Sequence, residues 1–271
     1  MQFSKYAGCG NDFILVDLRD KNSQFSSEAI RQLCDRKNGI GADGLIALEW
    51  GEKAHYRMRI FNRDGSEAEM CGNGLRCFKK YLEELDIKDL SVKVETLSGI
   101  KTATSLGHEV KVDMGPPSEI RWDVDLGQGI KVDFLNTGVP HAVCFVPDIK
   151  DQELMINAPW IRRHPAFQPA GANVNFVQVK EGKVWVRTFE RGVEAETLAC
   201  GTGMTASGIA AAVRFKLSSP VVIVPLSLEE VKVEYTQVDH KILESSQTGP
   251  ARFIFQGNFH YAPKSPQKSA C

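Results

Sequence analysis

Two cysteines begin nearly identical tetrapeptides in the two halves of this chain. The sequence Cys-Gly-Asn-Gly occupies residues 71–74, and Cys-Gly-Thr-Gly occupies residues 200–203. Each tetrapeptide follows a segment with strand character and precedes an apolar run of helical length, which predicts a cysteine at the N-terminus of a helix. The N–H groups and the dipole at that end of a helix favour both a thiolate and a bound carboxylate. The two motifs therefore predict acid–base chemistry by thiols on a small carboxylic acid.

Two opposed thiols could invert a carbon that lies between an amino group and a carboxylate. One base removes a proton from one face of this carbon while an acid delivers a proton to the other face. A free cysteine has a pKa of about 8.5, and a helix N-terminus can lower that pKa to about 3.5–7.5, which is our expectation here. The thiols should titrate as a coupled pair. The backbone N–H groups of Gly72, Asn73, Gly201 and Thr202 would bind the carboxylate and stabilise the carbanion.

An internal repeat supports this chemistry, because a single cysteine at a helix start is more often a buried structural residue. Gly-Ala-Asp at 41–43 matches Gly-Ala-Asn at 171–173, and Arg-x-Phe-x-Arg at 59–63 matches the same pattern at 187–191. The two cysteine tetrapeptides complete the set. The three separations are 130, 128 and 129 residues. One order and one spacing indicate two similar halves related by duplication.

The surrounding elements predict an α/β fold of two pseudo-symmetric domains. Gly115-Pro116-Pro117 is the strongest breaker in the chain, so we place a domain boundary there, between residues 1–117 and 118–251. The run 204–215 is rich in alanine and apolar nearly all round, which predicts a helix buried inside a domain wrapped by strands. The polar tail at 263–271 should fray, with Cys271 as an exposed thiol.

The first glycine-rich bend, at residues 8–12, lies between two segments with strand character. The favoured interpretation is a bulged hairpin in which Asn11 is a turn residue. In the alternative interpretation, the bend brings the backbone close to a ligand and Asn11 presents its amide there.

Composition narrows the class of partner. The chain has 271 residues, of which 42% are apolar, and its 33 basic and 34 acidic residues nearly cancel. This balance gives no basic surface for nucleic acid and no sign of membrane association, so the expected partner is a small molecule. The first residues contain no apolar signal core, which predicts a cytosolic protein. A homodimer is compatible with the sequence.

The seven cysteines do not form a metal or disulfide framework. Their number is odd. The sequence contains no Cys-x-x-Cys pair, and no histidine partners at zinc-ligand spacing accompany the cysteines. We expect reduced, mostly buried thiols and no metal. The proposed thiol chemistry also needs no pyridoxal phosphate, and neither a cofactor lysine nor a phosphate-binding loop is evident, so no cofactor is expected.

Taken together, the motifs resemble those of the diaminopimelate epimerases over nearly the whole chain. They occur in the family's order and spacing: Gly10-Asn11-Asp12-Phe13, Phe61-Asn62, Asp64-Gly65-Ser66-Glu67, Cys71-Gly72-Asn73-Gly74, Pro140-His141, Asn173, Glu190-Arg191-Gly192 and Ala199-Cys200-Gly201-Thr202-Gly203. The resemblance implies a strongly curved sheet or barrel around a central helix in each domain, an active site in the interdomain cleft, and a C-terminal strand at 252–262 that returns to the first domain.

The resemblance also implies a reaction, the interconversion of LL- and meso-2,6-diaminoheptanedioate in lysine and peptidoglycan precursor synthesis. It implies that Cys200 takes the proton from the LL substrate and that Cys71 donates the new one. The other implied site residues are His141 and Glu190, which would tune the thiols, and Asn11, Asn62, Asn173, Glu190 and Arg191, which would hold the polar ends of the substrate. Each has a structural alternative: Asn62 could only shape its turn, His141 could be a satisfied core residue, and Arg191 could pair with Glu190.

Two positions depart from the pattern common in the family. Val139 stands before Pro-His where many members have Asn, and Gly44 follows Asp43 where many have Gln. Both positions belong to substrate recognition in the family, so the distal end of the substrate could be held less tightly or differently.

Other functions stay open at this point. One is another cofactor-independent amino-acid racemase or isomerase on the same fold, such as a proline racemase-like enzyme. A phenazine-biosynthesis-type isomerase is disfavoured because it does not use the cysteine pair. The remaining alternatives are a protein that captures a zwitterion without turnover and a metal-binding thiol protein.

Overall fold

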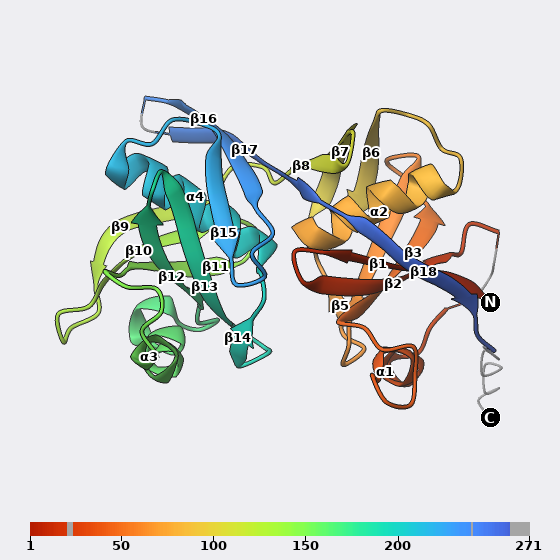
Figure 1. Ribbon diagram of the computed structural model, residues 1–271, viewed down its shortest axis with the longest axis horizontal. Helices are drawn as coiled ribbons and strands as arrows, with labels where there is room; N and C mark the ends of the chain where they lie inside the picture. The colour runs from red at the N-terminus through yellow and green to blue at the C-terminus, as the bar shows by residue number, and fades with distance from the viewer. Residues whose placement is uncertain (21–23, 240, 261–271) are drawn as a thin grey trace, which may run out of the picture.

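The computed structural model describes residues 1–20, 24–239 and 241–260, and it has two lobes that lie side by side (Figure 1). The tail predicted at 263–271, including Cys271, and the last two residues of the predicted strand 252–262 lie outside the described residues. No helix in the described ranges has the length and apolar character needed to cross a membrane.

The first lobe consists of a sheet and two helices. Its elements are β1 (Gln2–Gly8), β2 (Asn11–Asp17), α1 (Ser27–Cys34), β3 (Gly44–Trp50), β4 (Tyr56–Asn62), β5 (Glu67–Ala68), α2 (Gly72–Glu84), β6 (Ser91–Thr96), β7 (Gly99–Leu106), β8 (Glu109–Asp113) and the final strand β18 (Arg252–Asn258). The strands surround α2, which contacts β1, β2, β7 and β8 most closely.

The second lobe repeats this order of elements, with an additional first strand, β9, and a short 3₁₀ helix, η1. Its elements are β9 (Glu119–Asp125), β10 (Lys131–Asn136), β11 (Pro140–Phe145), α3 (Glu153–Arg162), the short 3₁₀ helix η1 (Pro165–Phe167), β12 (Asn173–Lys180), β13 (Lys183–Glu190), β14 (Ala195–Thr197), α4 (Gly201–Phe215), β15 (Val221–Pro225), β16 (Val231–Val238) and β17 (Lys241–Pro250). Here α4 is the central helix and packs against β13, β15 and β16.

Strand pairing repeats between the lobes. In the first lobe β2 runs parallel to β3 and β4 runs parallel to β6, with an antiparallel β3–β4 pair between them. In the second lobe β11 and β12 are parallel, β12 and β13 antiparallel, and β13 and β15 parallel. The same sequence of pairings in the same order confirms the predicted α/β fold of two similar halves.

The long segment β17–β18 connects the lobes (Figure 1). β17 pairs with β16 in the second lobe and also with β8 in the first, and β18 then pairs antiparallel with β1. Because one continuous stretch of chain contributes to both sheets, the position of β17 ties the two central helices to each other.

Local sequence explains why the two central helices are enclosed. In α2 nearly every side chain is buried, with Leu75, Phe78 and Leu82 in the core of the first lobe. In α4 small residues let the strands come close: a Cβ added at Gly208 would lie 3.0 Å from Cβ of Val233. The predicted burial of the run 204–215 holds for residues 204–212, while Val213, Arg214 and Phe215 at the end of α4 are exposed. A helix enclosed by strands must be apolar on most of its faces.

The bend at residues 8–12 forms a tight hairpin between β1 and β2. Cys9 and Gly10 are its two central residues, and both have positive φ, 54° and 82°, as in a two-residue type I′ turn. The β1–β2 pairing has no bulge at this turn. A Cβ at Gly10 would lie 2.7 Å from Cβ of Leu198, so this glycine lets the hairpin pack against the second lobe.

Candidate active site

Cys71 and Cys200 occupy equivalent positions at the starts of the two central helices. Cys71 is the N-cap of α2, where its sulfur accepts a hydrogen bond from the N–H of Gly74 at 3.4 Å. Cys200 is the N-cap of α4, and its sulfur lies 3.5 Å from the hydroxyl of Thr202. Each cysteine has extended backbone angles and precedes a first turn whose N–H groups have no partner within the helix.

The two helix N-termini meet between the lobes. A Cβ built on Gly201 would lie 3.3 Å from the backbone nitrogen of Gly72 and 3.6 Å from that of Asn73. The first turns of α2 and α4 therefore lie against each other, with Cys71 and Cys200 as their N-caps. Such a place favours a carboxylate, because both helix dipoles and the N–H groups of both first turns act on it.

Our expectation that the helix N-termini would lower the thiol pKa values is wrong for this structure. Burial raises the pKa of Cys71 and of Cys200, and the nearby charge of Glu190 raises both further. The N–H of Gly74 lowers the pKa of Cys71, and the hydroxyl of Thr202 and the N–H of Gly203 lower that of Cys200, in each case by less than burial raises it. The reason is that loss of water destabilises a thiolate by more than one or two amide hydrogen bonds stabilise it. The six cysteines within the described residues are all free thiols.

His141 is fully buried beside the start of α4. Its Nδ1 lies 2.8 Å from the side-chain oxygen of Asn175, and its Nε2 lies 2.9 Å from the hydroxyl of Thr202. The pKa of His141 is lowered to about 4, chiefly by burial; the hydrogen bond with Asn175 raises it, and the charge of Arg191 contributes to the lowering. The ring is therefore neutral at pH 7, and it reaches Cys200 through the hydroxyl of Thr202.

His141 should make the protein less stable as the pH falls from about 6.5 to about 4. An unfolded histidine takes up a proton near pH 6.5, whereas folded His141 does so only near pH 4, so the proton favours the unfolded chain by about 3 kcal/mol. Urea unfolding between pH 7 and pH 4 should show this loss, and the variant His141→Gln should lack it. The nitrogen NMR shifts of the His141 ring report its protonation state. A protonated ring in the folded wild type at pH 6 would contradict this expectation.

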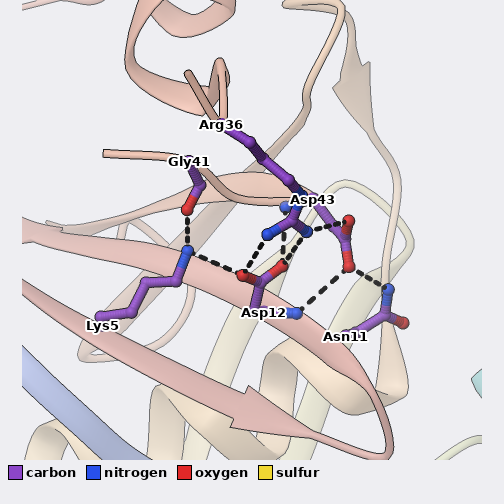
Figure 2. Close-up of polar contacts among 6 residues, drawn as sticks. All are labelled: Lys5, Asn11, Asp12, Arg36, Gly41 and Asp43. Atoms are coloured by element: carbon purple, nitrogen blue, oxygen red, sulfur yellow. Dashed lines mark hydrogen bonds and ion pairs between the residues drawn. The ribbon is translucent and has the colours of Figure 1, made fainter. Parts of the chain in front are cut away.

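A chain of amides runs from α2 to a group of charges in the first lobe. The side-chain N–H of Asn73 donates to the oxygen of Asn11 at 2.8 Å, and the side-chain N–H of Asn11 donates to Asp43 at 3.2 Å. Figure 2 shows Asp43 and Asp12 sharing the guanidinium of Arg36, with distances of 2.8 Å and 2.7 Å. Lys5 completes the group with a 2.8 Å ion pair to Asp12. Asn11 is thus a positioned amide at the active-site end of its hairpin.

Replacement of Asp12 by asparagine should destabilise the protein by about 3 kcal/mol at pH 7, because it leaves the buried ammonium of Lys5 without its partner. Burial raises the pKa of Asp12, but Arg36 and Lys5 outweigh burial and hold it at about 2. A lowered pKa gives stability that is complete above about pH 4 and is lost as the pH falls towards 2. Urea unfolding should show the variant and the wild type converging over that range. Asp86→Asn, at an exposed ion pair with Lys88, is the control and should change little.

The other predicted residues divide into two groups. Glu190 at the end of β13 is half-buried near both thiols, and burial raises its pKa. Buried Asn173 accepts a hydrogen bond from the backbone N–H of Arg191 at 2.7 Å. Arg191 donates from its guanidinium to the carbonyl of Ala170 at 3.3 Å, and it is not ion-paired with Glu190 among the described contacts. Asn62 is exposed, and its side-chain N–H donates to the hydroxyl of Ser66 within its own turn.

The two unusual positions lie in confined surroundings. Gly44 is the strand partner of Asn62, and a Cβ there would lie 2.5 Å from the carbonyl oxygen of Phe61. Val139 is half-buried next to Gly138, whose Cβ position lies 3.5 Å from the side chain of Thr202. A longer residue at 44 would require the strand to shift, so this chain presents less side chain here.

Four residues at the site were not predicted from the sequence. They are Asn175, which orients His141; Thr137, whose hydroxyl donates to the carbonyl of Thr202 at 2.8 Å; Arg76 in α2; and Gln247 in β17. The sequence could have indicated Asn175, because it lies two residues after Asn173 in a strand and therefore on the same face as that predicted site residue. Gln247 carried none, because only the pairing of β17 brings it to the helices.

The chain belongs to a class of proteins in which two similar lobes each wrap a sheet around a central helix. A hydroxyproline epimerase from Agrobacterium vitis has this fold, with a TM-score of 0.72 over 98% of this chain and 92% of its own, at 16% identity. The sequence matches the diaminopimelate epimerase family over residues 3–120 and 134–254. The diaminopimelate epimerase of Aquifex aeolicus is 40% identical over 95% of this chain and 97% of its own length. That of Hydrogenobaculum is 39% identical over 96% and 99%. This chain is a member of the diaminopimelate epimerase family.

Proposed function

We propose that this protein is a diaminopimelate epimerase, an isomerase that interconverts LL- and meso-2,6-diaminoheptanedioate. The observation that carries the proposal is the family match over nearly the whole chain. The reaction serves the synthesis of lysine and of peptidoglycan precursors. The proposal includes a small-molecule substrate and a cytosolic location, as the sequence predicts.

In the proposed mechanism the two cysteines act as an acid–base pair. The thiolate of Cys200 removes the α-proton of the LL isomer, the C–H bond breaks, and the electron pair moves into the adjacent carboxylate. The thiol of Cys71 then gives its proton to the opposite face of the carbon, and the roles reverse for the meso isomer. The contact between the starts of α2 and α4 supports this pairing, since each cysteine is the N-cap of one of these two helices.

Stabilisation of the carbanion falls to the two helix N-termini. The N–H groups at Gly72, Asn73, Gly201 and Thr202 would hold the carboxylate as its negative charge grows. Neutral His141 would orient Thr202 beside Cys200, and Glu190 would set the charge near both thiols.

The distal end of the substrate would be held by the remaining predicted residues. Asn11 and Asn173 are already fixed by hydrogen bonds, and the side chains of Asn62 and Arg191 have exposed or half-exposed ends that could turn towards a ligand. We propose that Gly44 and Val139 leave this end less crowded and less hydrogen-bonded than in relatives with longer polar side chains. The division into halves at residues 1–117 and 118–251 places one proton-transferring cysteine in each.

Incubation with meso-diaminopimelate in deuterium oxide tests the proposed function. Proton NMR should show loss of the α-proton signal and appearance of the LL isomer. Proline, hydroxyproline and glutamate serve as comparison substrates and should not exchange. Exchange of proline instead would move the assignment to another activity on this fold, and absence of both exchange and LL isomer would overturn it.

A further inference from the structure

Arg76 is a buried cation in the helix that begins at Cys71. Its side chain is fully buried, and its guanidinium donates to the carbonyl of Pro250 at 3.2 Å, to Gln247 at 3.1 Å, to the sulfur of Cys9 at 3.1 Å and to Asn73 at 2.7 Å. Among the residues that the structure describes, it makes no ion pair. Burial of a charge without an ion-pair partner lowers the stability of the folded protein. A charge that is nevertheless retained close to the site suggests a role in function.

The hydrogen bonds of Arg76 continue into the polar chain described above. Because the guanidinium donates to the oxygen of Asn73, the amide nitrogen of Asn73 must point to Asn11, and that of Asn11 to Asp43. Every link donates in the same direction, from a cation at one end to a carboxylate at the other. Such a chain polarises each member and strengthens each bond. It begins at Arg76 and Asn73 in α2, and the backbone N–H of Asn73 also donates to Cys71.

The second half of the protein lacks this chain. At the equivalent positions, 129 residues further along the chain, Thr205 corresponds to Arg76, Thr202 to Asn73 and Pro140 to Asn11. Gln247 lies between the two halves and shows the difference: its amide oxygen accepts from Arg76 at 3.1 Å, and its amide nitrogen donates to the hydroxyl of Thr205 at 2.7 Å. Arg76 and Thr205, which are equivalent in the duplicated fold, thus hydrogen-bond to opposite ends of the Gln247 amide. Only Arg76 is charged.

The charges that face Cys71 come from several elements. Glu190 at the end of β13 opposes ionisation of Cys71, and Arg76 in its own helix favours it. An ionised Cys71 in turn raises the pKa of Cys200. Buried Cys77 in α2 has a raised pKa and stays neutral, as does His141 of β11. Asp43 lies near Glu190 and adds to its cost of ionisation. Arg76 is the positive charge within this set.

We propose that Arg76 is a positioning residue that makes the two thiols unequal, and that its buried charge keeps the thiolate of the unliganded enzyme on Cys71. Cys200 then starts as the thiol, so the unliganded enzyme is set to take the proton of the meso isomer through Cys71. Reaction of the LL isomer requires the other form, in which the thiolate is on Cys200. Duplication alone would give two equivalent cysteines, and the loss of the cation from one copy removes that equivalence. The inference rests on the two-cysteine mechanism proposed above.

Alkylation by iodoacetamide, followed at each cysteine by peptide mass spectrometry across pH 6–10, tests this inference. In the wild type, the pH midpoint for alkylation should be lower at Cys71 than at Cys200. Arg76→Gln should slow alkylation of Cys71 at pH 7 by about tenfold, because one unit of pKa changes the thiolate fraction tenfold. It should not slow alkylation of Cys200, because less thiolate on Cys71 eases ionisation of its partner. Arg76→Lys should restore most of the reactivity of Cys71, since it keeps the charge.

Thr205→Val is the matched control. It breaks the contact of Gln247 with α4 without removing a charge, so it should leave the midpoint of Cys71 in place. A wild-type midpoint lower at Cys200 than at Cys71 would overturn the inference without any variant. An equal effect of Thr205→Val, or no rescue by lysine, would show that Arg76 acts by packing alone. The deuterium exchange described above is a separate measurement, so failure of the proposed reaction and failure of this inference can be told apart.

Discussion

Replacing either Cys71 or Cys200 by alanine should lower kcat in both directions by 10²–10⁴-fold, because each thiol supplies one of the two proton transfers. The two variants should differ in partial exchange. Cys71→Ala keeps Cys200, so it should still exchange the α-proton of the LL isomer with deuterium, without inversion. Cys200→Ala should do the same with the meso isomer. Steady-state assays and proton NMR in deuterium oxide measure both effects.

Cys77→Ala is the control for this pair. Cys77 is buried in the same helix as Cys71, in the core of the first lobe, and is not assigned a role in catalysis. Its replacement should lower the free energy of unfolding by about 1 kcal/mol and leave kcat close to that of the wild type. Formation of the meso isomer by Cys71→Ala would contradict the assignment of Cys71 as the second acid.

Gly201→Ala should lower kcat/KM by about 10²-fold while changing stability little. The new methyl group would lie 3.3 Å from the nitrogen of Gly72 and 3.6 Å from that of Asn73, where the carboxylate is proposed to bind. It would block those N–H groups and push the helix starts apart by a few tenths of an ångström, and small misplacements at a reacting centre can cost this much. Alanine also favours the helix more than glycine, which offsets the crowding.

Gly208→Ala should have the opposite effect, a loss of stability without a loss of kcat/KM. Its methyl group would meet Val233 at 3.0 Å in the core of the second lobe, far along the same helix from Cys200. Unfolding experiments should show a loss of about 1–3 kcal/mol, while the folded fraction keeps its kcat/KM. If Gly201→Ala instead behaved like Gly208→Ala, the contact between the helix starts would be structural and not part of carboxylate binding.

The amino-acid sequence by itself determined the outline of this protein. The repeated motifs at nearly constant separation predicted two similar halves, and the two tetrapeptides predicted cysteines at helix starts, because glycine, a capping residue and an apolar run are local signals. The family follows from the same motifs. The order of the elements is also local information, since each strand and helix shows its period within a few residues of chain.

Only the tertiary structure decided how the site is tuned. The pKa values of Cys71 and Cys200 depend on how much water the packed lobes exclude, and burial outweighed the helix N-terminus that the sequence favoured. Gln247 reaches both central helices because β17 pairs with strands of both lobes. Arg76 and Thr205 occupy matching positions in the printed sequence, but their shared contact with one buried amide appears only when the halves come together. Desolvation and long-range contact are properties of the assembled fold, so no local pattern could specify them.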